Sequence, residues 1–324
     1  MSVYDEPPAR GVNSVQELFE HGTQALSKIL AGQRELIEQA LVALLAGGHA
    51  LIEGVPGVAK TLAVKSLAKW LALDYRRIQG TADMMPADIT GTNVFLPARN
   101  EFAFHKGPAF TQFLLADEVN RMPPRTQAAL LECMEERQIT ADGVRHKLDP
   151  YFTVFATQNP VEFEGTYPLP EAQLDRFLLK IRIGYPSERE ELTVLQRHHT
   201  AAGPLDQIAI SSIDPAWVAA GRAEVRAVKA EEQVLQYLLS VVRRTRSWPA
   251  ISLGASPRAA VALLITAKAY AAKDGRDYLL PDDVKSAAMP CLRHRLQLKP
   301  EAELEGLDAD RVLADVLAAS PVPQ

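Results

Sequence analysis

The sequence has few of the features that mark disulfide-rich, membrane-spanning or nucleic-acid-binding proteins. Its 324 residues include only two cysteines, Cys133 and Cys291, which lack the CxxC spacing of zinc sites. No apolar run is long enough to span a bilayer, and no charged-then-apolar leader opens the chain. The net charge of −5 leaves no general basic footprint for nucleic acid. These absences predict a soluble protein of a reducing compartment, the cytoplasm, and make nucleic acid an unexpected partner.

What the sequence does have is a regular alternation of short apolar runs and helical patterns. The runs typical of buried strands lie at 50–53, Tyr75–Gln79, Gln112–Glu118, Tyr151–Gln158 and Phe177–Ile183. Strands that alternate with helices in this way form a parallel sheet between two helical layers. We therefore expect a three-layer αβα core with a five-stranded parallel sheet.

The pattern changes after residue 186, where helical periodicity dominates and no further strand of any length is indicated. The expected helices are Glu188–His199, Pro215–Val228, Glu231–Trp248, Ser256–Lys273 and Asp282–Leu296. This division predicts a core over residues 1–186, a linker and first lid helix over 187–205, and a separate all-helical lid domain over 206–324.

The stretch GVPGVAKT, from Gly54 to Thr61, has the residues of a phosphate-binding loop between a strand and a helix. Such a loop holds phosphate oxygens with inward-pointing N–H groups and the positive end of the helix. Lys60 can then reach the β- and γ-phosphates, and Thr61 can offer its hydroxyl to Mg²⁺. The consensus has glycine where this chain has Ala59, and alanine fits if its φ is negative. The alternative is a strand–turn–helix crossover with a chance Lys-Thr pair.

Two further polar groups follow predicted strands. Asp117 and Glu118 end a buried run, and strand ends beside a phosphate loop are where open α/β sheets bind ligands. Asp117 is placed to hold Mg²⁺, and Glu118 to orient and deprotonate a water. Asn159 ends the next strand and could position that water, although an Asn-Pro turn explains it equally well. Together these motifs predict hydrolysis of a nucleoside triphosphate.

Two arginines are candidates for stabilising phosphoryl charge. Arg176 precedes the last strand, and Arg258 lies in the first turn of a helix that begins Ser256-Pro257. Arg176 is expected on the far side of the sheet from its own phosphate loop. A catalytic role would therefore be played in a neighbouring subunit's site, which requires a ring. Either arginine alone is more often a surface salt-bridge residue.

Two hairpins are predicted within the core. Residues 93–106 alternate around Arg99-Asn100, and residues 138–148 alternate around Asp142-Gly143. The first interrupts a connection that is longer than α/β units need, so it is either a functional insertion or a cover for a sheet edge.

The segments GVPGVAKT, LLADEVNRMPPRTQAALLECMEE, FATQNP, LPEAQLDRF and GASPRA, in this order and spacing, resemble the MoxR family of AAA+ ATPases. The resemblance covers about residues 13–300. It implies a P-loop AAA+ core with a helical lid, ATP and Mg²⁺ as cofactors, and ATP hydrolysis. In that family alanine also stands in place of the last loop glycine. The two hairpins resemble the helix-2 insert and the pre-sensor hairpin of the clade, which face the pore or the partner side.

The resemblance also assigns roles to individual residues. Glu118 is the Walker B base, Asn159 sensor 1, Arg176 the arginine finger and Arg258 sensor 2. Thr61 and Asp117 are the implied Mg²⁺ ligands, partly through water. The implied nucleotide contacts are Gly54, Val55, Pro56, Gly57, Val58, Ala59, Lys60, Thr61, Leu62 and Asp117. Arg121 and Arg125 are further candidates for the contact across the subunit interface, and the sequence does not rank them against Arg176.

For the whole protein, the resemblance implies an ATP-promoted homo-hexamer with a chaperone-like role. Such proteins mature or activate a partner protein, often one with a von Willebrand factor A domain. Two alternatives stay open: the motor subunit of a metal chelatase, which has nearly the same core, and a nucleic-acid translocating motor. The acidic charge balance argues against the second.

Overall fold

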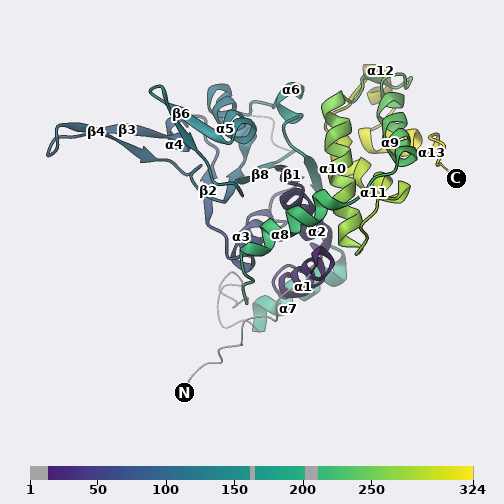
Figure 1. The fold of residues 1–324 in the computed structure, drawn as a ribbon, viewed down its shortest axis with the longest axis horizontal. Helices are drawn as coiled ribbons and strands as arrows, with labels where there is room; N and C mark the ends of the chain where they lie inside the picture. Colours follow the sequence, from purple (N-terminus) through teal and green to yellow (C-terminus); the bar gives the residue numbers. More distant parts are fainter. Residues whose placement is uncertain (1–13, 161–164, 201–210, 324) are drawn as a thin grey trace.

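The structure is a computed structural model that describes residues 14–160, 165–200 and 211–323 (Figure 1). Its central strands are β1 (Ala50–Gly54), β2 (Tyr75–Gln79), β5 (Phe113–Asp117), β8 (Thr153–Gln158) and β9 (Leu179–Ile183). They form one parallel sheet in the order β2-β5-β8-β1-β9. The predicted five-stranded parallel sheet is confirmed.

Helices cover both faces of this sheet. The core helices are α1 (Val15–Ser27), α2 (Arg34–Leu45), α3 (Lys60–Trp70), α4 (Ala87–Thr90), the 3-10 turn η1 (Val119–Arg121), α5 (Pro124–Glu136) and α6 (Glu171–Leu174). Strand β5 shows the layering, because its successive side chains point to opposite faces. Phe113 and Leu115 join an apolar cluster with α1, α2 and α3, whereas Leu114 and Ala116 join a second cluster with α5. The three-layer αβα arrangement is therefore confirmed.

The second part of the chain is mostly helical. Its elements are α7 (Glu188–Thr200), α8 (Ala216–Ala227), α9 (Glu232–Thr245), β10 (Ile251–Leu253), α10 (Pro257–Lys273), α11 (Pro281–Leu292), β11 (Gln297–Leu298), α12 (Pro300–Leu304) and α13 (Ala309–Ala318). The lid is not purely α-helical, because β10 and β11 pair antiparallel. Strands this short carry no readable alternation of apolar and polar residues, which is why the sequence analysis missed them.

Several of these helices pack on the core, among them α8, α10 and α11. Helix α8 packs between α2 and lid helix α10, and the Arg222 Nε donates to the Leu44 carbonyl oxygen at 2.9 Å. Helix α7, expected as the first lid helix, lies beside α1 (Figure 1). Part of the expected linker, residues 201–210, lies outside the described residues. Within the part of the chain that is described, no helix is long and apolar enough to cross a bilayer.

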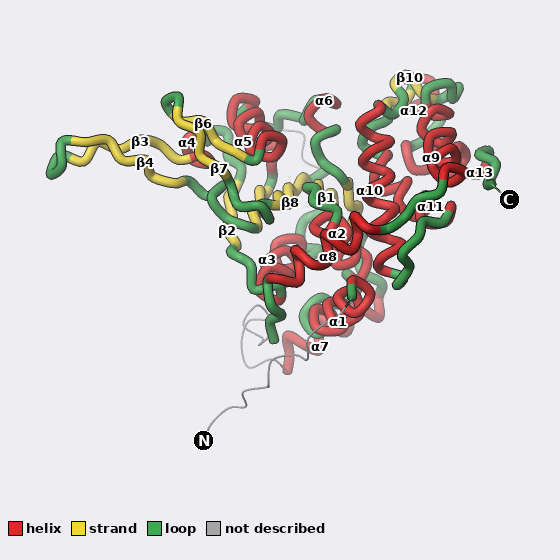
Figure 2. Tube along the Cα trace, viewed as in Figure 1, coloured by secondary structure: helices red, strands yellow, loops and turns green. Residues whose placement is uncertain are grey.

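Both predicted hairpins are confirmed, and they lie side by side (Figure 2). The first is formed by β3 (Gly91–Leu96) and β4 (Glu101–Lys106), the second by β6 (Gln138–Ala141) and β7 (Val144–Lys147). Two contacts join them. The ring of Phe104 stacks on His146 with centroids 4.1 Å apart, and the Asn93 Nδ2 donates to the Asp142 Oδ2 at 2.5 Å. The hairpins therefore form one projecting unit.

A buried histidine ties the beginning of β1 to its neighbours. His49 lies directly before β1, where its Nδ1 accepts a hydrogen bond from the Val154 N–H at 2.9 Å. Its Nε2 lies 3.1 Å from the Met134 carbonyl oxygen and donates to it. Burial lowers the pKa of His49 to about 3, so the folded protein keeps this imidazole neutral.

We predict that the free energy of unfolding falls as the pH is lowered from about 7.5 to about 5.5. The unfolded chain protonates His49 near its ordinary pKa, whereas the folded chain does not, so protons favour unfolding in this range. At pH 5.5 this histidine lowers the free energy of unfolding by about 1 kcal/mol relative to pH 7.5. Urea unfolding at both pH values measures it. His49→Gln should lose this part of the pH dependence, and His21→Gln, at an exposed position of α1, should keep it. An unchanged pH dependence in His49→Gln would contradict the assignment.

Candidate nucleotide-binding site

The Lys60 ammonium lies at the ends of β1 and β8. The Lys60 Nζ donates to the Gly54 carbonyl oxygen at 2.6 Å and to the Gln158 carbonyl oxygen at 3.4 Å. Gly57 has a φ of +84° and Ala59 a φ of +60°. The expectation of a negative φ at Ala59 is therefore wrong. The chain enters α3 through a left-handed residue, which is the conformation that the consensus glycine serves and which costs alanine about 1 kcal/mol.

The carboxylate of Asp117 is the most heavily bonded group of the site. Asp117 is buried, with 7 % of its surface exposed. The Thr61 hydroxyl, in the first turn of α3, donates to its Oδ2 at 3.0 Å. The Thr157 hydroxyl, on β8, donates to its Oδ1 at 2.5 Å and accepts from the Glu118 N–H at 2.9 Å. Helix α3 and strand β8 thus hold the Asp117 carboxylate, and Thr157 also holds the backbone of the adjoining Glu118.

Strand β2 contributes two residues that the sequence analysis missed. Arg77 donates from Nε and Nη2 to the Asp117 Oδ2 at 3.1 and 2.9 Å. Gln79 donates from Nε2 to the Glu118 Oε2 at 2.9 Å. Residues two apart on a strand share a face, so the sequence places Arg77 and Gln79 together. Their position beside Asp117 follows only from the pairing of β2 with β5, in which Gln79 lies opposite Asp117. Arg121 forms an ion pair with the same Glu118 oxygen at 3.1 Å.

These oxygen donors fit a hydrated divalent cation. Thr61 and Asp117 meet at one point, and hard cations such as Mg²⁺ bind through a few protein oxygens while keeping several waters. The Arg77 guanidinium shows that positive charge is accepted at the Asp117 carboxylate. Thr61 and Asp117 are therefore the residues that would hold Mg²⁺.

The predicted polar residues come together at one edge of the sheet. Asn159 is the first residue after β8, which lies between β1 and β5, and 6 % of its surface is exposed. The phosphate loop leaves β1 at this edge, and Asp117 ends β5 there. The carboxyl ends of parallel strands meet at one edge, and this edge is the usual ligand site of an open α/β sheet.

Beside the phosphate loop lies an apolar cavity of about 470 Å³. Residues from four segments line it, among them Ile29, Leu30, Pro56, Leu62 and Val194. Cavities of this size with a mainly apolar lining are typical sites for small organic ligands. The sequence analysis named Pro56 and Leu62 as nucleotide contacts implied by the family resemblance. It missed the others because they come from distant parts of the chain.

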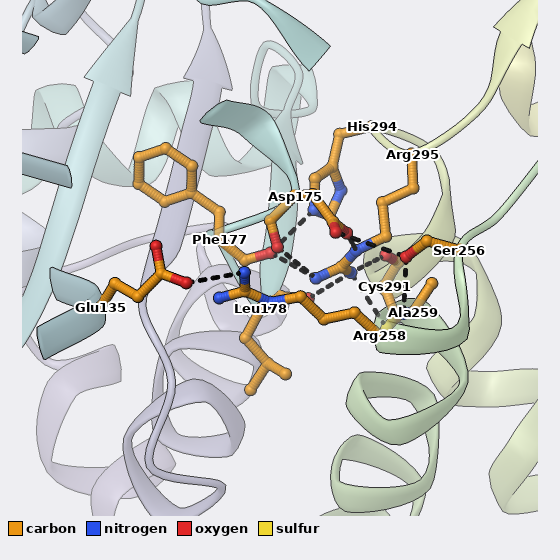
Figure 3. A network of polar contacts seen from close by, with 10 residues as sticks. All are labelled: Glu135, Asp175, Phe177, Leu178, Ser256, Arg258, Ala259, Cys291, His294 and Arg295. Atoms are coloured by element: carbon orange, nitrogen blue, oxygen red, sulfur yellow. Dashed lines mark hydrogen bonds and ion pairs between the residues drawn. The ribbon is translucent and has the colours of Figure 1, made fainter. Parts of the chain in front are cut away.

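Arg176 and Arg258 lie elsewhere. Ala50 pairs with Leu179, so Arg176 precedes the beginning of β9 at the edge opposite the phosphate loop, roughly 13 Å or more away. There both guanidinium groups meet the carboxylate of Glu135 on α5. The Arg176 Nε lies 2.7 Å from its Oε2, and the Arg258 Nη1 lies 3.1 Å from its Oε1 (Figure 3 shows the second pair). The hydrogen bond from Arg176 is the main cause that lowers the pKa of Glu135.

The other two candidate arginines occupy the edge that carries the phosphate loop. Arg121 pairs with Glu118 of its own chain, and Arg125 is exposed in the first turn of α5. Of these three arginines, Arg176 is the one at the opposite edge.

We predict that Ala59→Gly raises the free energy of unfolding by about 0.5–1 kcal/mol. Glycine relieves the left-handed strain, and the greater freedom of the unfolded glycine chain offsets part of the gain. Ala63→Gly, one turn further into α3, is the matched control and should lower the free energy of unfolding by about 1 kcal/mol or more. Equilibrium unfolding in urea measures both. An Ala59→Gly protein as destabilised as Ala63→Gly would contradict the positive φ.

Comparison with known proteins gives a consistent result. The model of the ATPase family associated with various cellular activities (AAA) matches residues 49–179, and that of the AAA lid domain matches residues 243–316. The chain is 44% identical to the uncharacterized protein YeaC of Bacillus subtilis, covering 94% of this chain and 95% of that protein. It is 40% identical to chaperone MoxR1 of Mycobacterium tuberculosis, covering 99% and 87%.

A solved structure agrees with these relatives. The crystal structure of a putative ATPase from Cytophaga hutchinsonii superposes with a TM-score of 0.88 at 40% identity, covering 96% of each chain. The structural similarity therefore extends over both the core and the lid. The chain belongs to the MoxR family of AAA+ ATPases.

Proposed function

We propose that this protein hydrolyses ATP with Mg²⁺ in a homo-hexameric ring and uses the energy to remodel, mature or activate a partner protein. The observation that carries the proposal is the division of charged groups between the two edges of the sheet. Lys60, Thr61, Asp117 and Glu118 lie at one edge, and the Arg176–Arg258 pair lies at the other.

The residues at the first edge divide the work of hydrolysis. The loop N–H groups and Lys60 bind the phosphates, for which Lys60 exchanges the carbonyl oxygens of Gly54 and Gln158. Thr61 and Asp117 would hold Mg²⁺, which would supply positive charge to neutralise the phosphate oxygens. Arg77 binds the same Asp117 oxygen as Thr61, so its guanidinium holds the carboxylate in place and would be repelled by a divalent cation bound there.

Glu118 orients and deprotonates the attacking water. Gln79 and Arg121 both bind its Oε2, so the other carboxylate oxygen is directed to the water. Asn159, buried at the end of the neighbouring strand, positions the same water from the other side. The apolar cavity beside the loop takes the nucleobase.

Arg176 and Arg258 act in the site of the neighbouring subunit. Their distance from their own phosphate loop supports this role, and so does their convergence on one anion. Each of the two guanidinium groups binds one oxygen of the Glu135 carboxylate, so the pair can bind a single anionic group from two sides. A γ-phosphoryl group presents oxygens in a similar way. The alternative is a partly exposed salt-bridge cluster with no part in turnover.

The hairpin unit is the proposed surface for the partner protein, for which a von Willebrand factor A domain is our expectation. It projects from the body of the molecule (Figure 1), and its outer part carries the exposed cross-strand pair Phe95–Phe102, with ring centroids 5.2 Å apart. Exposed aromatic side chains are common at protein interfaces. The name of the chaperone relative supports a protein as the partner.

We predict that Lys60→Ala lowers the affinity for ATP at least about tenfold and reduces turnover to background, because a charged hydrogen bond to phosphate is lost. Lys65→Ala, on the exposed side of α3, is the control and should retain both properties. Titration with a fluorescent ATP analogue and a phosphate-release assay measure them. Wild-type turnover in Lys60→Ala would refute the loop assignment.

We also predict that Arg176→Ala and Arg258→Ala each bind ATP normally but lose turnover, by about 10³-fold for Arg176→Ala. Activity should return when either protein is mixed with Lys60→Ala subunits. The arginine variant supplies an intact phosphate loop, and the Lys60→Ala subunit supplies intact arginines. Differently tagged subunits that co-purify show that mixing has occurred. Mixed rings that stay inactive would contradict action across the interface.

A further inference from the structure

The buried guanidinium of Arg295 forms hydrogen bonds with the residues before and after Arg176. The side chain of Arg295, which follows α11, is 3 % exposed. It donates from Nε to the Asp175 Oδ1 at 2.6 Å, from Nη2 to the Phe177 carbonyl oxygen at 2.7 Å, and from Nη1 to the Leu178 carbonyl oxygen at 3.1 Å (Figure 3). These acceptors lie on both sides of Arg176, so one lid side chain fixes the segment that carries it.

The same network reaches the beginning of α10, where Arg258 is located. The Ser256 hydroxyl donates to the Asp175 Oδ2 at 3.3 Å and accepts the Ala259 N–H at 3.1 Å as the N-cap of α10. Asp175 therefore accepts Arg295 with one oxygen and the cap of α10 with the other. His294 adds a donor, since its Nε2 lies 2.9 Å from the Phe177 carbonyl oxygen.

We propose that Arg295 is a positioning residue that holds Arg176 and Arg258 as one preassembled pair for the nucleotide of the neighbouring subunit. The inference rests on the proposed function, because it assumes that the two arginines act across the interface. Arg295 itself is too deeply buried to touch that nucleotide. Its effect is geometric: donors fixed before the reaction need no reorganisation when charge develops on the phosphoryl group.

Lysine is the informative replacement for Arg295. A lysine keeps the positive charge beside Asp175, but its N–H groups share one nitrogen and do not reproduce the spacing with which Nε, Nη1 and Nη2 of Arg295 reach Asp175 and the two carbonyl oxygens. Arg276→Lys is the matched control. Arg276 forms a comparable bidentate pair with Asp283, at 2.7 and 2.6 Å. Its other side-chain hydrogen bonds go to Asp274 and Tyr278 rather than to the segments that carry Arg176 and Arg258. Asp175→Asn is a second test that removes the charge and keeps one oxygen acceptor.

The experiment compares ATP affinity, kcat and thermal melting of these proteins. We expect Arg295→Lys and Asp175→Asn to bind ATP within twofold of wild type, because their own phosphate loop is intact, and to lose kcat at least tenfold. Arg276→Lys should melt at a lower temperature with kcat unchanged. Equal kcat in Arg295→Lys and Arg276→Lys would overturn the assignment, as would a loss of ATP affinity parallel to the loss of kcat.

Mixed rings separate the positioning role from a folding defect. Arg295→Lys mixed with Lys60→Ala should recover activity, whereas Arg295→Lys mixed with Arg176→Ala should not, because both lack a correctly placed arginine pair. Suppose that Arg176→Ala mixed with Lys60→Ala recovers activity but Arg295→Lys mixed with Lys60→Ala does not. That result overturns the positioning role of Arg295 and leaves the ring mechanism intact. If Arg176→Ala with Lys60→Ala also stays inactive, the ring mechanism fails and the role of Arg295 fails with it.

Discussion

The parallel pairing of β1 with β9 is the constraint on which the rest of the site depends. Because the two strands run in the same direction, the phosphate loop leaves β1 at one edge and Arg176 enters β9 at the other. No side-chain rotation brings the two together within one chain, since the length of a strand separates them. If Arg176 is catalytic, the assembly is part of the chemistry, because each subunit would carry the phosphate loop of one site and the arginine of another.

The two edges are prepared in similar ways, with charged groups held by partners that a ligand would replace. At the loop edge Lys60 rests on backbone oxygens and Asp117 on the Arg77 guanidinium. At the opposite edge the Glu135 carboxylate lies between two arginines. Charged side chains held in this manner lose little further freedom on binding, which favours both affinity and turnover.

Much of this architecture could be predicted from the sequence, because the strands are continuous apolar runs and the loop motif is local. The hairpin turn at Asp142-Gly143 was equally readable, as both residues adopt the positive φ that such turns require. The contact of Arg77 with Asp117 was not, because it depends on which strands become neighbours. The meeting of Arg176 and Arg258 at Glu135 depends on three distant segments. The left-handed φ of Ala59 escaped prediction because alanine disfavours it, although the consensus glycine at this position is the residue that such a φ suits.

The most direct test is the mass in solution of the Glu118→Gln protein, measured by light scattering with and without Mg²⁺ and ATP. The substitution removes the base and keeps the loop, so bound ATP should persist. The account predicts a shift to a hexamer-sized species that requires both the metal and the nucleotide, and loss of that shift when Lys60→Ala is added. A protein that stays monomeric with ATP bound, while the wild type hydrolyses ATP as a monomer, would contradict the shared site.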